Sequence, residues 1–394
     1  MPAINRRSLV HALIAAALFA VGISILSLVI AGSENAGNKD FISYWAAGQL
    51  LIRHSNPYDP AAVYELEKSA GFRESKPLLM RNPPFALVLA LPLGLVPAKL
   101  GVVLWSILLV AAIMASVRLL WSIHGRPPDR LHLFGYIFAP TVACLPLGQT
   151  SVFALLGLVL FLRFHRTMPF AAGACLAFAA IKPHLFVLFG LVLLLWAFNR
   201  RAYSLLLGVT AAIACNLIPV MYFDPSVFSH YLPVLSQAGA ESKVIPSLSA
   251  VVRIAIDPQA AWPQFVPVIC GCLWAVWYFS QHAKEWNWDT HGSRLLLASV
   301  WVAPYSWFTD EIVVLPAIMQ GLYTSASRGR SLLGFGIIDG LALAAVVVGV
   351  PVGSGFYIWT STAWLFWFLY AVRGETLKEG ESGPRNSSEQ APAS

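Results

Sequence analysis

Residues 166–201 read RTMPFAAGACLAFAAIKPHLFVLFGLVLLLWAFNRR, and this stretch decides the fold class. Its apolar part is about 30 residues long, is flanked by basic residues and is interrupted by Lys182-Pro183. Basic clusters beside apolar spans stay in the cytoplasm, so both ends of the stretch belong on one side of the membrane. We therefore predict two short spans of about 14–15 residues that turn at Lys182-Pro183, with the turn dipping into the membrane or a protein cavity.

The composition agrees with a membrane protein. Of 394 residues, 58% are hydrophobic and 11% charged, whereas soluble domains carry about 25% charged residues. The net charge of +7 comes from short clusters between apolar runs, which orient a membrane protein and do not indicate a nucleic-acid partner. Cys270-Gly-Cys272 has no second ligand pair nearby, so we expect buried thiols, no metal site and no cofactor.

The same charge rule predicts the remaining topology. It folds residues 131–164 into a hairpin turning at Gly148-Gln149-Thr150, and residues 295–327 into one turning near Thr309-Asp310-Glu311. Leu9–Ala31 is longer than the 7–15 apolar residues typical of a signal peptide, so we expect an anchored first span. The result is an all-α polytopic protein of roughly 10–13 spans with both termini in the cytoplasm.

This topology divides the chain into a transmembrane domain, residues 1–373, and a disordered cytoplasmic tail, residues 374–394. The first exoplasmic loop covers residues 33–82 and the second exoplasmic segment residues 223–262, in which Ser247–Ile256 is a re-entrant or interfacial candidate. In the first loop, Asp59-Pro60 is typical of a helix start and Gly71 of a helix end. The side of this helix expected to be apolar carries Val63, Leu66 and Ala70.

Ionisable and polar residues gather at the predicted exoplasmic turns. They are Asp40, Gln149, Lys182, Asp310 and Glu311. Charged groups at membrane depth are expensive and mark a functional site by default. We therefore expect these side chains to converge on one face of the membrane.

Asp40 has three possible roles. It is a functional carboxylate, a loop residue paired with Lys39, or the cap of a helix running from Phe41 to Ile52. Its neighbours Tyr44 and Trp45 fit either an interfacial anchor or a wall on which a sugar stacks.

Lys182 must find an anion, snorkel or lose its charge, because a charged lysine between apolar half-spans is costly. A phosphate-bearing ligand would satisfy it, as would an ion pair with Asp310 or Glu311. Gln149 either binds a sugar hydroxyl or caps a backbone turn. His184 belongs to the same cavity or is a structural hydrogen bonder, and Asp339 is expected to pack against the bundle.

Two proline motifs flank the first-loop helix. Asn56-Pro57-Tyr58-Asp59 is first of all a turn, and Arg81-Asn82-Pro83-Pro84-Phe85 begins the next membrane segment. Asn56, Tyr58, Arg81 and Asn82 are ligand-binding candidates, although Arg81 would equally contact a lipid phosphate.

The order of these motifs resembles glycosyltransferase family 87, the polyprenyl-phosphate-mannose-type mannosyltransferases of the GT-C superfold. The resemblance runs over about residues 38–320 through Asp40-Phe41…Tyr44-Trp45-Ala46-Ala47-Gly48, the two proline motifs, Gly148-Gln149-Thr150-Ser151, Ala172–Lys182-Pro183 and Ala303-Pro304-Tyr305-Ser306-Trp307. It implies a GT-C-like helical bundle in the bacterial inner membrane. It also implies that Asp40 is catalytic, with a lipid-phosphate sugar donor and inverting transfer to a glycan or glycolipid acceptor. We expect the other candidates to bind the donor or the acceptor.

Two departures from the family pattern limit this transfer. The family often has a histidine shortly after the last motif, where this chain reads Phe308-Thr309-Asp310-Glu311. Many GT-C enzymes carry paired acids in the first loop, where this chain has Lys39 before Asp40, so a tightly held divalent metal is not expected.

Three functions fit the sequence. The first is inverting transfer of a hexose, mannose foremost, from a polyprenyl-phosphate donor to a lipid-linked or envelope glycan at the exoplasmic face. A secondary transporter or flippase would line its path with the same charges. A non-catalytic envelope scaffold would keep the fold alone. The long first loop with its acid favours the enzyme.

Overall fold

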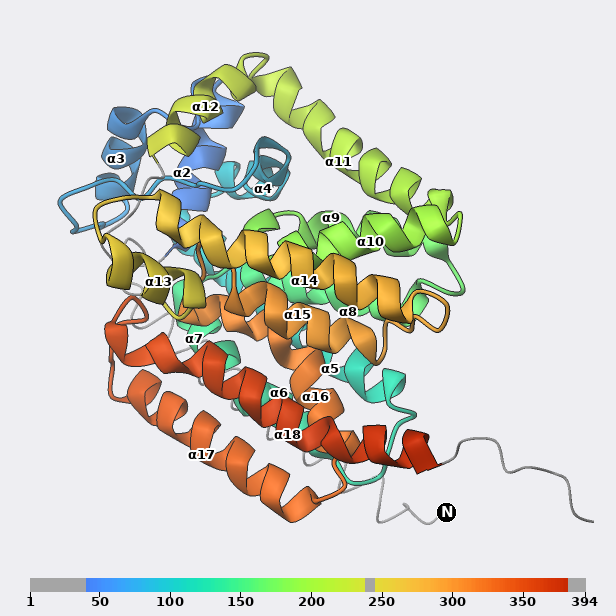
Figure 1. Ribbon diagram of the computed structural model, residues 1–394. Helices are drawn as coiled ribbons and strands as arrows, with labels where there is room; N and C mark the ends of the chain where they lie inside the picture. Colours follow the sequence, from blue (N-terminus) through green and yellow to red (C-terminus); the bar gives the residue numbers. More distant parts are fainter. Residues whose placement is uncertain (1–39, 238–244, 382–394) are drawn as a thin grey trace, which may run out of the picture. The chain divides into compact units, whose positions relative to one another are not determined.

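The computed structural model describes residues 40–237 and 245–381 (Figure 1). Within these ranges the regular elements are all helices, and no strand is present. The all-α polytopic fold class is therefore confirmed. The predicted first span, Leu9–Ala31, lies outside the described residues, as do residues 382–394 of the predicted tail, whereas α18 runs to Glu381.

Four helices of the described part are long and apolar enough to cross a membrane alone. They are α5 (Ala98–Ile123), α11 (Tyr203–Phe223), the continuous η5–α14 segment (Trp262–His282) and α17 (Arg328–Val347). Other apolar helices are shorter, as the charge rule predicts. The helices on the two sides of Lys182-Pro183, α9 (Pro169–Ala179) and α10 (Val187–Asn199), have 11 and 13 residues. Neither reaches the roughly 20 residues of a complete span.

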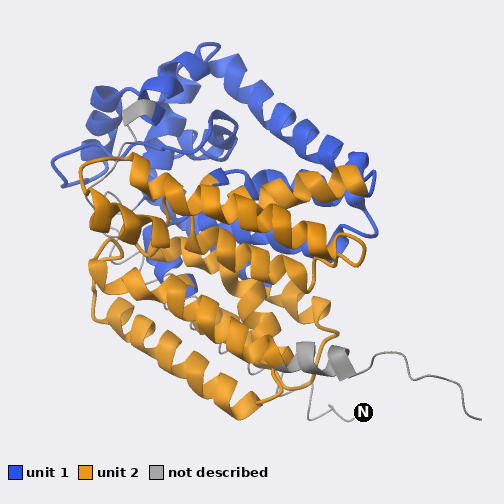
Figure 2. Cartoon of the chain, viewed as in Figure 1, with its two compact units in different colours: residues 1–116, 141–183, 200–241 blue, residues 117–140, 184–199, 242–394 orange. Residues whose placement is uncertain are grey.

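Figure 2 shows two compact units, each assembled from three stretches of chain. Unit 1 comprises residues 1–116, 141–183 and 200–241. Its elements are α2 (Phe41–Ile52), α3 (Pro60–Ser69), η2 (Pro84–Leu89), α4 (Leu91–Gly94), most of α5, most of α7 (Ala139–Leu147), α8 (Ser151–Phe164), α9, α11 and α12 (Val227–Gln237).

Unit 2 comprises residues 117–140, 184–199 and 242–394. Its elements are η3 (Leu131–Leu133), α6 (Phe134–Ile137), most of η4 (Pro183–Phe186), α10, α13 (Leu248–Ile256), η5 (Trp262–Phe265), α14 (Val266–His282), α15 (His291–Trp301), η6 (Phe308–Val314), α16 (Leu315–Thr324), α17, η7 (Gly355–Trp359) and α18 (Thr360–Glu381).

Glycines bring α9 and α11 of unit 1 into backbone contact. A Cβ on Gly173 would lie 2.0 Å from the Leu205 carbonyl oxygen, and a Cβ on Gly208 would lie 2.0 Å from the Phe170 carbonyl oxygen. Small residues let helices approach closely where lipid removes the hydrophobic driving force. This contact fixes α9, and with it the start of the turn that carries Lys182.

Asp339 of α17 is buried in unit 2, where it accepts the Ala139 backbone N–H at 2.7 Å. It thereby satisfies a donor at the start of α7. Trp367 of α18 donates to the Ser331 carbonyl at 2.9 Å. The predicted packing role of Asp339 is confirmed.

The first-loop helix α3 begins as predicted, with Pro60 in its first turn and the Asp59 carboxylate accepting the Ala61 N–H at 3.0 Å. Gly71, which follows the helix, has φ +95°. The buried side is partly different from the prediction. Val63 is buried, but its buried companion is Glu67, because the returning chain supplies the Leu78 N–H to that carboxylate.

The apolar stretch in the predicted second segment forms α13, and the Ser247 hydroxyl caps it by accepting the Ala250 N–H at 3.2 Å. Its exposed large side chains are apolar, namely Val251, Ile254 and Ile256. Such a face is typical of a helix that contacts the membrane interface.

The five cysteines are free. Only Cys144 is buried, whereas Cys215 on α11 and Cys270 on α14 are exposed, so the prediction of buried thiols is wrong for these two. The physical reason is that both helices are candidate membrane spans, whose outer faces are apolar as well as their inner ones.

Candidate active site

Asp40 immediately precedes α2, which starts and ends where the helix alternative predicted. Its carboxylate makes no capping hydrogen bond to the helix. The Ser43 hydroxyl instead donates to the Asp40 main-chain carbonyl at 2.7 Å. The Asp40 carboxylate accepts a hydrogen bond from Nε2 of Gln149, so its side chain is bonded to the turn before α8 and does not cap its own helix.

The turn between α7 and α8 places Gln149 against α2. Gly148 has φ +75°, and a Cβ on it would lie 2.9 Å from Cβ of Phe41. Trp105 donates its indole N–H to the Gly148 carbonyl at 2.8 Å. A left-handed backbone and a close approach both require glycine here, and together they place Gln149 next to Asp40.

Lys182 follows α9 and is 8% exposed. Its ammonium donates to Oε1 of Gln149 at 3.0 Å and to Oγ of Ser151 at 2.9 Å. The structure therefore brings three predicted residues together. We call Asp40, Gln149, Ser151 and Lys182 the Asp40 cluster.

Ser151 was not among the predicted site residues. It is the first residue of α8 and is fully buried. A serine at a helix start is usually a cap, so its position alone does not indicate a site residue. The available signal was its place in Gly148-Gln149-Thr150-Ser151, two residues after the candidate Gln149.

Asn82 lies beside the same cluster, because its side-chain amide donates to the Ile181 carbonyl at 3.1 Å. Arg81 is exposed, and its main-chain carbonyl accepts the Tyr231 hydroxyl at 3.3 Å. Of these two candidates, Asn82 therefore supports the backbone that carries Lys182.

Four other candidates of unit 1 have packing or turn roles. Tyr44 packs on Trp105 at 5.4 Å between ring centroids, and Trp45 donates to the Val96 carbonyl at 2.9 Å. Both rings are buried in the core of unit 1. Asn56 accepts the Tyr58 N–H at 2.9 Å in the predicted turn, and the buried Tyr58 ring packs on Tyr231.

The remaining candidates belong to unit 2. His184 packs edge-on against Tyr305, with ring centroids 5.6 Å apart. Asp310 is fully buried, and its carboxylate accepts the Trp307 N–H at 2.9 Å, which caps the start of η6. The predicted turn near Asp310 is thus a 3₁₀ helix that is capped by Asp310 itself.

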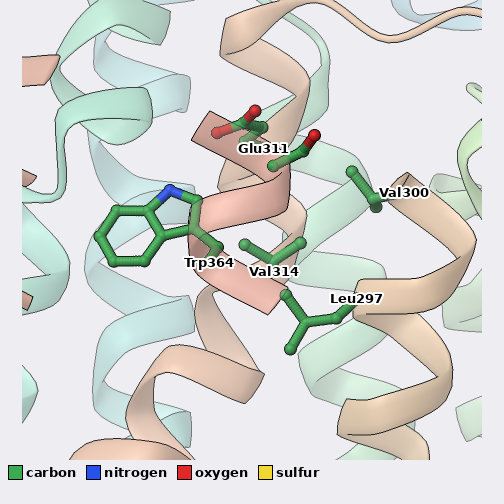
Figure 3. A pocket seen from close by; sticks show the side chains of 6 residues that line it. Leu297, Val300, Glu311, Val314 and Trp364 are labelled. Carbon is green, nitrogen blue, oxygen red and sulfur yellow. The ribbon is translucent and has the colours of Figure 1, made fainter. Parts of the chain in front are cut away.

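Glu311 is also fully buried, and one of its carboxylate oxygens accepts the Thr360 hydroxyl at 2.6 Å. Figure 3 shows it beside Trp364 in a narrow space that is otherwise lined by Leu297, Val300, Val314 and Ser361. This space is too tight for a water molecule, so a sugar has no room there. Glu311 is a partner of Thr360 in this arrangement.

Among the described residues, no group of three His, Cys, Asp or Glu side chains is placed to hold a metal ion. The Asp40 cluster offers one carboxylate next to an ammonium group. Divalent cations usually take several oxygen ligands, whereas this set of side chains contains a single carboxylate.

The family model for glycosyltransferase family 87 matches residues 81–304, more than half of the chain. The chain belongs to this family. It is therefore a membrane glycosyltransferase. No curated protein and no solved structure matches the chain significantly.

The family 87 match is shorter than the resemblance traced from the motifs. It includes Arg81, Asn82, Gln149, Lys182 and His184. Asp40, Tyr44, Trp45, Asn56 and Tyr58 precede it, and Asp310 and Glu311 follow it. Asp40 joins the matched part of the enzyme through its hydrogen bond with Gln149.

Two buried polar residues of the family 87 enzyme were not predicted from the sequence. Arg253 of α13 is buried in unit 2, although an arginine on an amphipathic helix is usually exposed. Asp224 is buried in unit 1 and pairs with Nδ1 of His230 at 2.8 Å. Neither belongs to a recognised motif, and their burial is a tertiary property that the sequence does not display.

Proposed function

We propose that this enzyme transfers a hexose, with mannose as first candidate, from a polyprenyl-phosphate donor to a lipid-linked or envelope glycan. Membership of family 87 supports sugar transfer in a membrane. The almost completely buried Lys182 ammonium supports an anionic ligand, because a positive charge that is shielded from water attracts an anion strongly. A lipid phosphate resides in the membrane and is an anion, so it meets both requirements.

The proposed reaction is a single inverting displacement. Asp40 accepts the proton of the acceptor hydroxyl, whose oxygen forms a bond to the anomeric carbon. The bond from that carbon to the phosphate oxygen breaks, and its electron pair leaves with the lipid phosphate. Because phosphate is a good leaving group, no general acid is needed, unlike in glycoside hydrolysis.

One observation carries this proposal: the side-chain amide of Gln149 joins the Asp40 carboxylate to the Lys182 ammonium. A base for the acceptor and a cation for the departing phosphate are the minimum set for this chemistry. Both lie in unit 1, where two stretches of the chain, residues 1–116 and 141–183, supply them.

We further propose that the site faces the exoplasmic side of a bacterial inner membrane, with residues 1–373 as the catalytic domain and both termini in the cytoplasm. The uniform placement of basic clusters supports this topology. Single cysteines beside Lys182, in a cysteine-free protein, should react with an impermeant reagent from the exoplasmic side. Reaction from the cytoplasmic side alone would overturn the topology.

The chemistry is tested with Asp40→Asn in the purified enzyme. Asparagine keeps the size and still accepts from Gln149, but it cannot take up the proton. General-base catalysis contributes about 10²–10⁴-fold, so turnover of a polyprenyl-phosphate-mannose should fall by that factor. Glu74→Gln, at an exposed acid of the first loop, is the matched control and should remain active. An active Asp40→Asn enzyme would refute the assignment of the base.

The substrates are tested in cells. Mass spectrometry of envelope lipids and glycans, with and without the protein, should reveal one glycan that lacks a hexose. An unchanged glycan structure with an altered distribution across the membrane would contradict sugar transfer and favour a flippase.

A further inference from the structure

We propose that Gln149 is a positioning residue that holds the Asp40 carboxylate for proton abstraction and transmits the charge of Lys182 to it. This inference rests on the proposed function of Asp40. The resemblance leaves Gln149 as a ligand-binding candidate, whereas the hydrogen bonds of its amide point to a role inside the protein.

The orientation of the Gln149 amide is determined by its two partners. An ammonium group only donates hydrogen bonds, and an ionised carboxylate only accepts them. Oε1 must therefore face Lys182, and Nε2 must face Asp40. A flipped amide would lose both hydrogen bonds, so the side chain has one stable arrangement.

The Gln149 amide also transmits the polarising effect of Lys182 to Asp40. Lys182 withdraws electron density from Oε1, which strengthens the Nε2–H donor that contacts Asp40. Such cooperative strengthening is greatest where water is excluded, and Gln149 is 6% exposed. Through Gln149, the positive charge of Lys182 stabilises the ionised form of Asp40, which is the form that acts as a base.

The ends of this chain of hydrogen bonds are themselves held. Ser151 accepts a second hydrogen bond from Lys182 at 2.9 Å, which limits the positions of the ammonium. Trp105 fixes the Gly148 carbonyl directly before Gln149. The preorganised amide thus needs no rearrangement when the acceptor arrives.

If Gln149 acts through Asp40, its loss should lower kcat and leave donor affinity almost unchanged. Misplacing a catalytic group by about 1 Å costs about 10²-fold in rate. Gln149→Met keeps the length of the side chain and removes both hydrogen bonds. Gln149→Glu keeps an acceptor for Lys182, so that variant should fold well, but it presents a like charge to Asp40.

The test uses the full-length enzyme in nanodiscs with a polyprenyl-phosphate-mannose as donor. Gln149→Met should lose about 10²-fold in kcat, with a donor Kd within about twofold of wild type, because Ser151 still holds the Lys182 ammonium. Gln149→Glu should lose at least as much in kcat. Gln149→Met combined with Asp40→Asn should be no slower than Asp40→Asn alone, because the two changes remove one function.

Gln49→Met is the matched control. Gln49 also holds α2 through its side-chain amide, by donating to the Gly94 carbonyl at 2.6 Å, but it lies near the other end of the helix. Gln49→Met should leave kcat unchanged, and adding it to Asp40→Asn should not change the rate of that variant.

Three results would overturn the inference: a rise in donor Kd with unchanged kcat, full activity of Gln149→Glu, or multiplicative losses in the double variant. Failure of the proposed function has a different signature, namely an active Asp40→Asn enzyme.

Discussion

The side-chain amide of Asn82 donates to the main-chain carbonyl of Ile181 at 3.1 Å, although the two residues are 99 positions apart in the chain. Ile181 immediately precedes Lys182, so the asparagine of the second proline motif fixes the backbone that carries the buried ammonium. A motif that begins a membrane segment therefore also positions a residue of the Asp40 cluster.

Replacing Asn82 should impair Lys182 indirectly. Asn82→Leu leaves the Ile181 carbonyl without this partner, and the loss of one hydrogen bond costs about 0.5–1.5 kcal/mol. We expect kcat/KM to fall about tenfold, since that is the factor for about 1.4 kcal/mol, with a small drop in Tm. Asn287→Leu, which removes a comparable side-chain bond to the Asp289 N–H in unit 2, should lower Tm alone. Equal kcat/KM losses in both variants would contradict the role of Asn82.

Lys182→Met should weaken donor binding. Losing a charge-assisted hydrogen bond costs about 1.5–3 kcal/mol, which corresponds to about a 10- to 100-fold rise in Kd for a polyprenyl-phosphate sugar. Lys182→Arg keeps the charge but not the compact ammonium that Gln149 and Ser151 hold, so it should restore little. Lys68→Met, at an exposed ion pair of α3, is the control. An unchanged donor Kd in Lys182→Met would make Lys182 purely structural.

Gly148→Ala should cost both stability and activity. The left-handed φ of +75° disfavours alanine by about 1–2 kcal/mol, and the added Cβ would also press on Phe41 at the start of α2. Gly349 offers a close comparison, because its φ is +81° and its Cβ would meet no atom within 4 Å. Thermal unfolding should show a smaller loss for Gly349→Ala, and that enzyme should keep its turnover. Full activity of Gly148→Ala would contradict the close approach.

The first loop should lose stability as the pH rises. Burial raises the pKa of Glu67 to about 7 from an ordinary value of 4.5, although its hydrogen bond with the Leu78 N–H opposes the shift. The folded loop therefore keeps a proton that the unfolded loop releases between about pH 4.5 and 7. The stabilisation is complete below pH 4.5 and is lost by about pH 7, a change on the order of 3 kcal/mol.

Hydrogen exchange of residues 60–80, corrected for the intrinsic pH dependence, measures this effect. Glu67→Gln should abolish the pH dependence, because its amide is neutral and still accepts the Leu78 N–H. Glu65→Gln, on the exposed side of α3, should behave like wild type. A pH-independent wild-type loop would show that Glu67 stays ionised in the folded protein.

The sequence predicted those features that depend on local chemistry. Lys182-Pro183 and Gly148 interrupt apolar runs. Charge bias and turn preference act within a few residues, so the sequence correctly predicted that helices are interrupted at both places. The bounds of α2 and the cap of α3 follow for the same reason. These local signals also identified Asp40, Gln149 and Lys182, which unit 1 brings into one cluster.

What the sequence missed depends on tertiary partners. Ser151 looks like an ordinary helix start until Lys182 is seen beside it. Glu67 looks solvent-exposed until the returning chain supplies the Leu78 N–H. The sequence does not show whether Tyr44 and Trp45 line a surface or fill a core. Only the packing of Tyr44 on Trp105 and the hydrogen bond from Trp45 to the Val96 carbonyl show that both belong to the core.

The interleaving of the two units has a consequence for how the enzyme is made. The three stretches of unit 1 are synthesised one after another, with residues 117–140 and 184–199 of unit 2 between them. Asp40 leaves the ribosome first, Gln149 and Ser151 follow, and Lys182 comes later still. At about 5–20 residues per second, the interval between Asp40 and Lys182 lasts about 7 to 28 seconds. During that interval the Asp40 carboxylate is present without Lys182, so the hydrogen-bonded Asp40 cluster can form only after α9 and Lys182 have been synthesised.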